Sequence, residues 1–286
     1  MMTFSRLRRV GLLLMLVAAL RAEDLKDIEY ARAGRTSLRL DAHIPDGKGP
    51  FPAAILAHGG GWVRGDRSSV DPIFEALTNA GIAWFTVSYR LASDLLLDPA
   101  ASITQLGAAE NDVKQAIAFV KSHATEYHVN PNKVVLIGES AGGQLVSMAA
   151  LRPDPGGTVQ GVVAFYSPTD LPALVRTSSW IPESVRDAVK GTFWDTMMMA
   201  ELTKFSPITW VSSTAPPFLM IHGTDDNLIP FAQSERFCDK LNEANGSCEL
   251  YPVKIAGHGM RAWESSHITN YKAPMIRWLQ QVLALK

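Results

Sequence analysis

The sequence predicts an α/β domain built on a mainly parallel β-sheet. Short apolar runs rich in β-branched residues, typical of buried strands, recur along the chain. Longer segments with apolar side chains at helical spacing lie between them, and no internal repeat or low-complexity tract interrupts the alternation. Because parallel strands need long crossover connections, this pattern favours a parallel sheet covered by helices on both faces.

In the first half of the chain, residues 28–31 and 38–44 predict an opening hairpin, since apolar residues alternate along the second segment. The run Ala53-Ala54-Ile55-Leu56-Ala57 predicts a buried strand. A helix over 71–80 and a strand over 82–89 follow. Residues 106–122 carry apolar side chains at helical spacing and predict a long crossover helix.

The second half continues the alternation. Strands are expected at 133–137, 159–166, 217–221 and 248–255, where β-branched and aromatic residues gather in short runs. Helices are expected at 144–151, 231–243 and 271–285, the last one amphipathic.

Composition limits the function classes. The chain has 286 residues, of which 47% are hydrophobic and 19% charged, which is ordinary for a globular protein. The formal net charge is −1 and the body of the chain has no basic run, so nothing supports nucleic-acid binding.

Residues 1–22 have the pattern of a secretory signal peptide. Three arginines precede the apolar run Val10–Leu20, and the first acidic residue is Glu23. The run is shorter than the ~20 residues that span a bilayer, although an uncleaved anchor is the alternative. With cleavage after Ala19 or Ala22, we expect a secreted or periplasmic protein that consists of residues 23–286 and has no stable membrane insertion.

The stretch Gly138-Glu139-Ser140-Ala141-Gly142 lies between a predicted strand and a predicted helix. In such a strand-to-helix turn the serine hydroxyl projects outward, and the flanking glycines have no Cβ to collide with neighbours. The first free amides of the helix, beginning with Ala141, would point at whatever reacts with Ser140. The pattern predicts a nucleophile elbow; the alternative is a serine that only caps the helix.

Three consecutive glycines follow another predicted strand, in His58-Gly59-Gly60-Gly61-Trp62. Bare backbone at this place suggests an oxyanion hole, in which the amides of Gly60 and Gly61 would join that of Ala141. A flexible loop would explain the glycines but not their position directly after a buried strand.

Two later loops supply an acid and a base. The strand at 217–221 leads into His222-Gly223-Thr224-Asp225-Asp226, and Gly257-His258-Gly259 follows the strand at 248–255. The order serine, aspartate, histidine is that of an α/β-hydrolase triad. His258 would take the proton of Ser140 and Asp226 would orient the imidazole, with Asp225 as the competing acid.

Residues 169–211 break the alternation and are interpreted as a helical insertion over the active site. Trp180, Trp194 and Met198 of this segment, together with Trp62, are predicted to line the substrate site. The alternative for each is an ordinary core residue.

The cysteines Cys238 and Cys248 fall on a predicted helix and the strand after it. Export would allow a disulfide between them. If they are reduced, both are small core residues.

Together, the loops around Gly60, Ser140, Asp226 and His258 resemble those of α/β-hydrolase carboxylesterases, within them the secreted feruloyl and acetyl-xylan esterase-like branch near the hormone-sensitive-lipase type. The resemblance covers the chain from about Ile28 onward. It implies an α/β-hydrolase fold with a mainly parallel eight-stranded sheet, helices on both faces and a small helical cap insertion. It also implies Ser140, Asp226 and His258 as the triad and Gly60, Gly61 and Ala141 as oxyanion donors.

The resemblance implies hydrolysis of small acyl or aryl esters through an acyl-enzyme, with no metal or organic cofactor. The substrate would be a small-molecule or carbohydrate-linked ester, such as an acetyl or feruloyl ester of plant polysaccharide. A lipase, a prolyl-oligopeptidase-like peptidase or amidase, and a catalytically dead hydrolase fold used for binding are the alternatives. The oligomeric state is not predicted.

Overall fold

A single eight-stranded sheet forms the centre of the protein in a computed structural model. The structure describes residues 22–92, 99–177, 183–184, 187 and 190–285. The proposed signal peptide lies outside the described residues, apart from Ala22. Within them, no helix is long and apolar enough to cross a lipid bilayer.

The strands lie in the spatial order β1-β2-β4-β3-β5-β6-β7-β8. β2 runs antiparallel to β1 and β4, whereas β3 to β8 pair in parallel. The α/β-hydrolase fold predicted from the sequence is therefore confirmed. The bounds are β1 Glu23–Ala33, β2 Thr36–Ile44, β3 Phe51–Ala57, β4 Ala83–Val87, β5 Val129–Glu139, β6 Gly161–Phe165, β7 Phe218–Gly223 and β8 Cys248–Val253.

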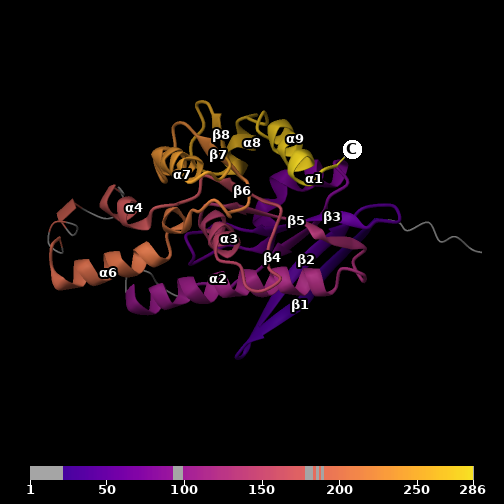
Figure 1. Cartoon of the computed structure of the whole chain (residues 1–286), viewed down its shortest axis with the longest axis horizontal. Helices are drawn as coiled ribbons and strands as arrows, with labels where there is room; N and C mark the ends of the chain where they lie inside the picture. The colour runs from indigo at the N-terminus through magenta and orange to yellow at the C-terminus, as the bar shows by residue number, and fades with distance from the viewer. Residues whose placement is uncertain (1–21, 93–98, 178–182, 185–186, 188–189, 286) are drawn as a thin grey trace, which may run out of the picture.

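Helices cover both faces of the sheet (Figure 1). One apolar core lies under α2, α3 and α7, and the other under η1, α1, α8 and α9. The strand β3 and residues 134–138 of β5 lie between the cores and are buried on both sides, which explains the unbroken apolar sequence of these two segments. The bounds are η1 Arg67–Ile73, α1 Phe74–Asn79, α2 Pro99–Ser122, α3 Ala141–Leu151, α7 Ala232–Glu243, α8 Met260–Ser265 and α9 Lys272–Val282.

The expected helix at 71–80 is split in the structure. Its first part belongs to the 3-10 helix η1, which Asp66 begins by accepting the amide of Ser68. Pro72 lies inside η1, and the regular helix α1 starts two residues later. The short helix α8, absent from the sequence-based expectations, starts two residues after His258.

The segment after β6 contains α4 (Leu171–Thr177), α6 (Phe193–Lys204) and η2 (Pro207–Trp210). Figure 1 shows α4 and α6 beyond the end of the sheet, beside the start of α2. This segment contacts α3 just after α6, because the side-chain amide of Gln144 donates to the carbonyl of Phe205 at 2.7 Å.

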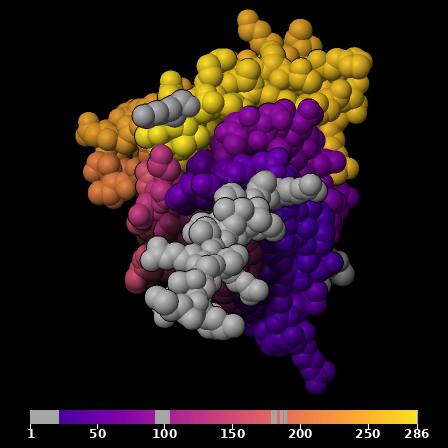
Figure 2. Space-filling model, turned by 90° about the vertical axis from the view of Figure 1, so that its right-hand side faces the viewer, coloured from indigo at the N-terminus to yellow at the C-terminus, as the bar shows by residue number. Residues whose placement is uncertain are grey.

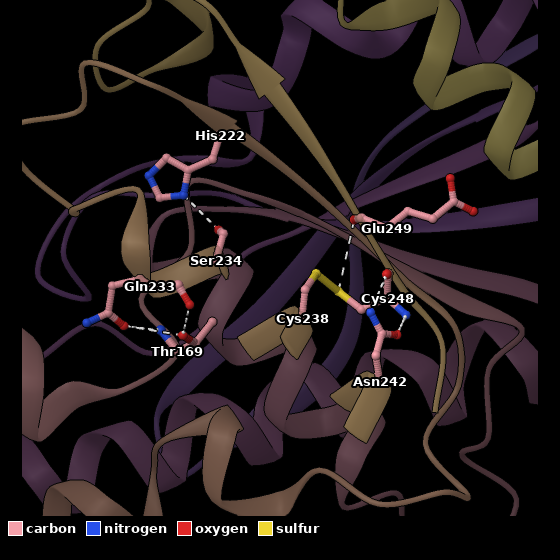
Figure 3. The surroundings of a disulfide bond; sticks show 8 residues. All are labelled: Thr169, His222, Gln233, Ser234, Cys238, Asn242, Cys248 and Glu249. Carbon is pink, nitrogen blue, oxygen red and sulfur yellow. Dashed lines mark hydrogen bonds between the residues drawn. A yellow bond between two sulfur atoms is a disulfide. The ribbon is translucent and has the colours of Figure 1, made fainter. Parts of the chain in front are cut away.

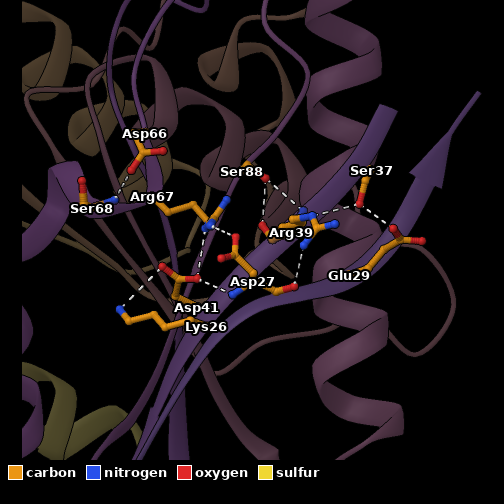
Figure 4. Close-up of polar contacts among 10 residues, drawn as sticks. All are labelled: Lys26, Asp27, Glu29, Ser37, Arg39, Asp41, Asp66, Arg67, Ser68 and Ser88. Atoms are coloured by element: carbon orange, nitrogen blue, oxygen red, sulfur yellow. Dashed lines mark hydrogen bonds and ion pairs between the residues drawn. The ribbon is translucent and has the colours of Figure 1, made fainter. Parts of the chain in front are cut away.

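The β1–β2 hairpin stands away from the body at its tip (Figure 2). Ion pairs attach its base to η1, because Arg67 contacts Asp27 at 2.7 Å and Asp41 at 3.3 Å (Figure 4). The side chains of Arg67 and Asp41 are only 16% and 13% exposed. This contact holds the hairpin against the 3-10 helix that follows the glycine-rich loop.

Candidate active site

Ser140, His258 and Asp226 form one hydrogen-bonded chain at the carboxyl edge of the parallel strands. The Nε2 of His258 lies 3.0 Å from the Oγ of Ser140, and its Nδ1 lies 2.7 Å from the Oδ2 of Asp226. The three residues follow β5, β8 and β7, so the parallel sheet brings distant segments together at one edge.

Ser140 lies on the turn between β5 and α3 with φ 50° and ψ −119°, a conformation that costs an L residue energy. The flanking glycines are needed for steric reasons. A Cβ on Gly142 would lie 2.3 Å from the carbonyl oxygens of Ala57 and His58, and one on Gly138 would lie 2.4 Å from that of Gly142. The close approach of β5, α3 and the loop after β3 therefore holds the serine in its strained geometry.

Asp226 is buried and fully hydrogen-bonded, whereas its neighbour Asp225 is exposed. The Oδ1 of Asp226 accepts the amides of Leu228 and Ile229 at 2.8 and 2.9 Å. Burial alone would raise the pKa of this carboxyl, but the hydrogen bonds from His222, His258 and the amide of Ile229, together with the charge of His258, outweigh burial and lower it. Asp226 is thus an anion fixed in front of the imidazole.

His222 supports Asp226 from behind and is fully buried. Its Nε2 donates to the carbonyl of Ile229 at 2.9 Å and lies 3.4 Å from Asp226, and its Nδ1 is 2.7 Å from the Oγ of Ser234. Ser234 belongs to α7, which a disulfide between Cys238 and Cys248 joins to β8 (Figure 3). The acid side of the site is therefore attached to a cross-linked helix and strand.

The loop after β3 is held in one conformation. His58 is buried, stacks on Tyr89 and donates from Nδ1 to the carbonyl of Gly59 at 2.7 Å. Burial lowers the pKa of His58, which favours the neutral ring. Because the carbonyl of Gly59 and the amide of Gly60 share one planar peptide unit, this bond also fixes the direction of the Gly60 amide.

The amides of Gly60, Gly61 and Ala141 donate no hydrogen bond to any described residue. Gly60 and Gly61 adopt φ angles of 116° and 62°, which favour glycine, and Ala141 begins α3. The same edge of the sheet thus carries a nucleophile and three unpaired donors.

The predicted substrate-site residues lie in different environments. Trp62 is buried and its indole donates to Gln144 at 3.0 Å, so it is a structural part of the loop. Trp194 lies on the outer side of α6, 77% exposed and packed edge-to-face on Phe193, while Met198 is half-buried. Trp180 lies outside the described residues.

Glu139 and Tyr166 have no role in the sequence analysis, yet they contact both active-site loops. The Oε1 of Glu139 accepts the amide of Gly59 at 3.2 Å, and its Oε2 accepts the hydroxyl of Tyr166 at 2.5 Å. Burial raises the pKa of Glu139, an effect that the bonds from Tyr166 and Gly59 oppose. A charged residue at the end of an otherwise buried strand was the available signal for Glu139; nothing in the sequence indicated Tyr166.

Among the described residues, no group of three or more histidine, cysteine or carboxylate side chains is placed to hold a metal ion.

The family model BD-FAE matches residues 40–241. A protein named probable carboxylic ester hydrolase LipM, from Mycobacterium tuberculosis, is 32% identical over 241 residues, covering 80% of this chain and 53% of its own length. An acetylxylan esterase of Xylanibacter ruminicola is 24% identical over 281 residues, covering 96% of this chain and 54% of its own. The chain thus spans about half the length of these curated relatives.

Solved structures agree on the fold. The butyrate-bound esterase Est2 of Thermogutta terrifontis superposes with a TM-score of 0.74 at 22% identity, covering 91% of this chain and 95% of that one. The family match covers most of the sequence, from the second strand through α7. The chain belongs to the BD-FAE family and has the α/β-hydrolase fold.

Proposed function

We propose that the protein is a serine ester hydrolase that works through an acyl-enzyme. The observation that carries the proposal is the continuous chain from Ser140 through His258 to Asp226, with distances of 3.0 and 2.7 Å. Both distances are those of hydrogen bonds, and the first places the proton acceptor within reach of the serine hydroxyl. A binding module without catalysis would not require this arrangement beside three unpaired amides.

In the first half-reaction, the Oγ of Ser140 attacks the ester carbonyl carbon while the Nε2 of His258 accepts its proton. Negative charge develops on the carbonyl oxygen, and the amides of Gly60, Gly61 and Ala141 stabilise it. The intermediate collapses when the bond to the alcohol oxygen breaks and His258 returns the proton to that oxygen. Ser140 is then acylated.

In the second half-reaction, water attacks the acyl-enzyme and gives its proton to His258. The same amides stabilise the second intermediate, and the serine leaves with the proton from His258. Throughout, Asp226 holds the imidazole in the tautomer that keeps Nε2 free for Ser140 and stabilises the imidazolium.

The substrate we propose is a small acyl or aryl ester, such as an acetyl or feruloyl ester carried by a plant polysaccharide. Support comes from the acetylxylan esterase relative and from the butyrate bound to the Thermogutta esterase. No metal or organic cofactor is needed, since the proposed residues supply nucleophile, base and oxyanion donors.

The test is a hydrolysis panel that compares p-nitrophenyl acetate, p-nitrophenyl palmitate, methyl ferulate and acetylated xylan. We expect turnover of the acetyl esters, and loss of nearly all of it in Ser140→Ala without change in the circular-dichroism spectrum. Equal turnover by Ser140→Ala in a clean preparation would refute the esterase mechanism. Cleavage of palmitate alone would refute the assignment of a small acyl or aryl ester.

A lipase is the second candidate, because the insertion exposes large apolar side chains. On α6, Phe193 is 71% exposed, Trp194 77% and Met197 47%. Such a patch suits an interface with lipid or another apolar surface. Faster turnover of the palmitate ester above its solubility limit would favour this function.

We also propose that the protein works outside the cytoplasm, secreted or periplasmic, after removal of residues 1–22. The disulfide between Cys238 and Cys248 supports this location, because disulfides persist in oxidising compartments. Mass spectrometry of the exported protein tests the proposal: we expect a chain that begins near residue 23, and a full-length chain in the cytoplasmic fraction would contradict it.

A further inference from the structure

A second chain of hydrogen bonds joins the oxyanion loop to the loop that carries His258. The hydrogen bonds of the triad do not connect these two loops with each other. The second chain starts at the amide of Gly59, which donates to Glu139 at 3.2 Å. The other oxygen of Glu139 accepts the hydroxyl of Tyr166 at 2.5 Å, and the Tyr166 oxygen accepts the amide of Met260 at 2.8 Å. One end lies in the oxyanion loop and the other lies two residues beyond His258.

The buried surroundings make this chain rigid. Tyr166 is fully buried, and its ring packs edge-to-face on His258 at 4.5 Å and on Trp263 at 5.2 Å. Its φ of 36° is unusual for a residue other than glycine and directs the side chain from the end of β6 toward these rings. A buried donor or acceptor left without its partner is costly, so each bond of the chain constrains the next.

The two loops must be aligned with each other for catalysis. The oxyanion loop places the Gly60 and Gly61 amides, and the histidine loop places the proton acceptor. The amides bind the oxyanion and the imidazole exchanges protons with the other oxygens of the same tetrahedral intermediate, so an error in the relative position of the loops weakens transition-state binding more than substrate binding.

We propose that Glu139 and Tyr166 are positioning residues that align the oxyanion loop with the histidine loop. The proposal rests on the serine ester hydrolysis described above. It assigns neither residue to the reacting atoms: Glu139 acts through Gly59, and Tyr166 acts through Met260 and the imidazole ring that it packs against.

Tyr166→Phe tests this chain most cleanly, because it removes the hydroxyl and keeps the ring against His258 and Trp263. With p-nitrophenyl acetate we expect kcat to fall about tenfold or more, with KM nearly unchanged, since misplacement by about 1 Å can cost ~100-fold. Glu139→Gln should behave alike, because the single acceptor oxygen of a glutamine amide cannot accept both the tyrosine hydroxyl and the amide of Gly59.

Tyr271→Phe is the matched control. Tyr271 is also fully buried, packs on Trp263 and donates to a glutamate, Glu264, at 2.7 Å. Its hydroxyl bonds neither active-site loop, so we expect a similar fall in melting temperature with kcat within about twofold of wild type. An equal loss of kcat in this variant would mean that activity follows general packing, and would overturn the proposal.

The double variant Glu139→Gln with Tyr166→Phe distinguishes one chain from two separate effects. If both residues act through the same chain, the double variant is no slower than the slower single variant. Losses of kcat that multiply in the double variant would overturn the proposal. Wild-type kcat in a folded Tyr166→Phe protein would also overturn it, and this single variant tests the proposal even if Glu139→Gln fails to fold. A wild-type protein that hydrolyses no ester would instead refute the proposed function, and with it this role.

Discussion

Asp225 and Asp226 show that the environment of a carboxylate decides whether it can serve as the acid of the triad. They are adjacent in the same loop, but Asp225 is exposed and its side chain accepts the hydroxyl of Thr224 at 3.0 Å. Asp226 is buried between two histidines and two backbone amides. Sequence position could not separate the two acids, because what distinguishes them is the direction of each side chain.

Asp226→Asn should lower kcat about 10³- to 10⁴-fold, because an amide would favour the wrong tautomer of the imidazole. Asp225→Asn, in the same loop, should leave kcat within about twofold of wild type. Initial-rate measurements on p-nitrophenyl acetate check both. A larger loss in Asp225→Asn would reverse the assignment of the acid.

The lowered pKa of Asp226 also predicts how stability depends on pH. A carboxyl whose pKa is lower in the folded state stabilises the fold above its unfolded-state pKa of about 3.9 and loses this effect as pH falls through the folded-state value. Wild type should therefore be more stable than Asp226→Asn near neutral pH, and the difference should narrow below about pH 4. Urea unfolding at pH 7 and pH 3 measures the difference in free energy of unfolding between wild type and Asp226→Asn. The same difference at both pH values would contradict the lowered pKa.

Gly142→Ala should destabilise the fold by about 3 kcal/mol or more, because the new Cβ would meet backbone oxygens at 2.3 Å and backbone cannot move aside cheaply. Gly156→Ala is the comparison: φ is 80° there but no atom lies within 4 Å, so the cost is the ~1 to 2 kcal/mol of left-handed backbone. Urea unfolding midpoints compare the two. Equal losses would mean that the elbow is not tightly packed.

At the scale of elements, the disulfide joins α7 to β8 beside the acid of the triad. Cys238 is buried on α7, one turn beyond Ser234, which contacts His222 (Figure 3). The side chain of Asn242 braces the same junction, since it accepts the amide of Cys248 at 2.8 Å and donates to its carbonyl at 3.1 Å.

Replacing both cysteines by alanine should lower the free energy of unfolding by about 2 to 3 kcal/mol, the range expected for a short closed loop. The packing of α7 on β7 and the bonds of His222 remain, so we expect kcat at 25 °C to change by less than about threefold. Thermal unfolding with and without reductant checks this. A wild-type protein whose melting temperature is unaffected by complete reduction would contradict a stabilising role.

At the scale of the whole molecule, short apolar runs predicted a strand at the place of each of the eight strands of the sheet, because buried strands have apolar sequences. The resemblance added the α/β-hydrolase fold in which those strands are arranged. Periodicity failed at 71–80, where a proline and an aspartate cap favour a 3-10 turn before the helix. It also missed α8, which has six residues, too few to show a helical period.

The candidate site was predictable where glycines mark close backbone approach, as at Gly60 and Gly142. It was not predictable where it depends on side chains of separate strands meeting, as for Glu139 and Tyr166. Trp62 was predicted to line the substrate site, and that role stays a prediction; the structure adds that its indole is buried and donates to Gln144.

The central claim is that Ser140 is the nucleophile that the sheet places beside His258. Paraoxon reports on it directly, because an activated serine displaces p-nitrophenol and keeps the diethylphosphoryl group, which peptide mass spectrometry locates. We predict one such group per chain, on Ser140, with parallel loss of esterase activity. A group on another residue, or full inactivation of ester hydrolysis with Ser140 unmodified, would contradict the account.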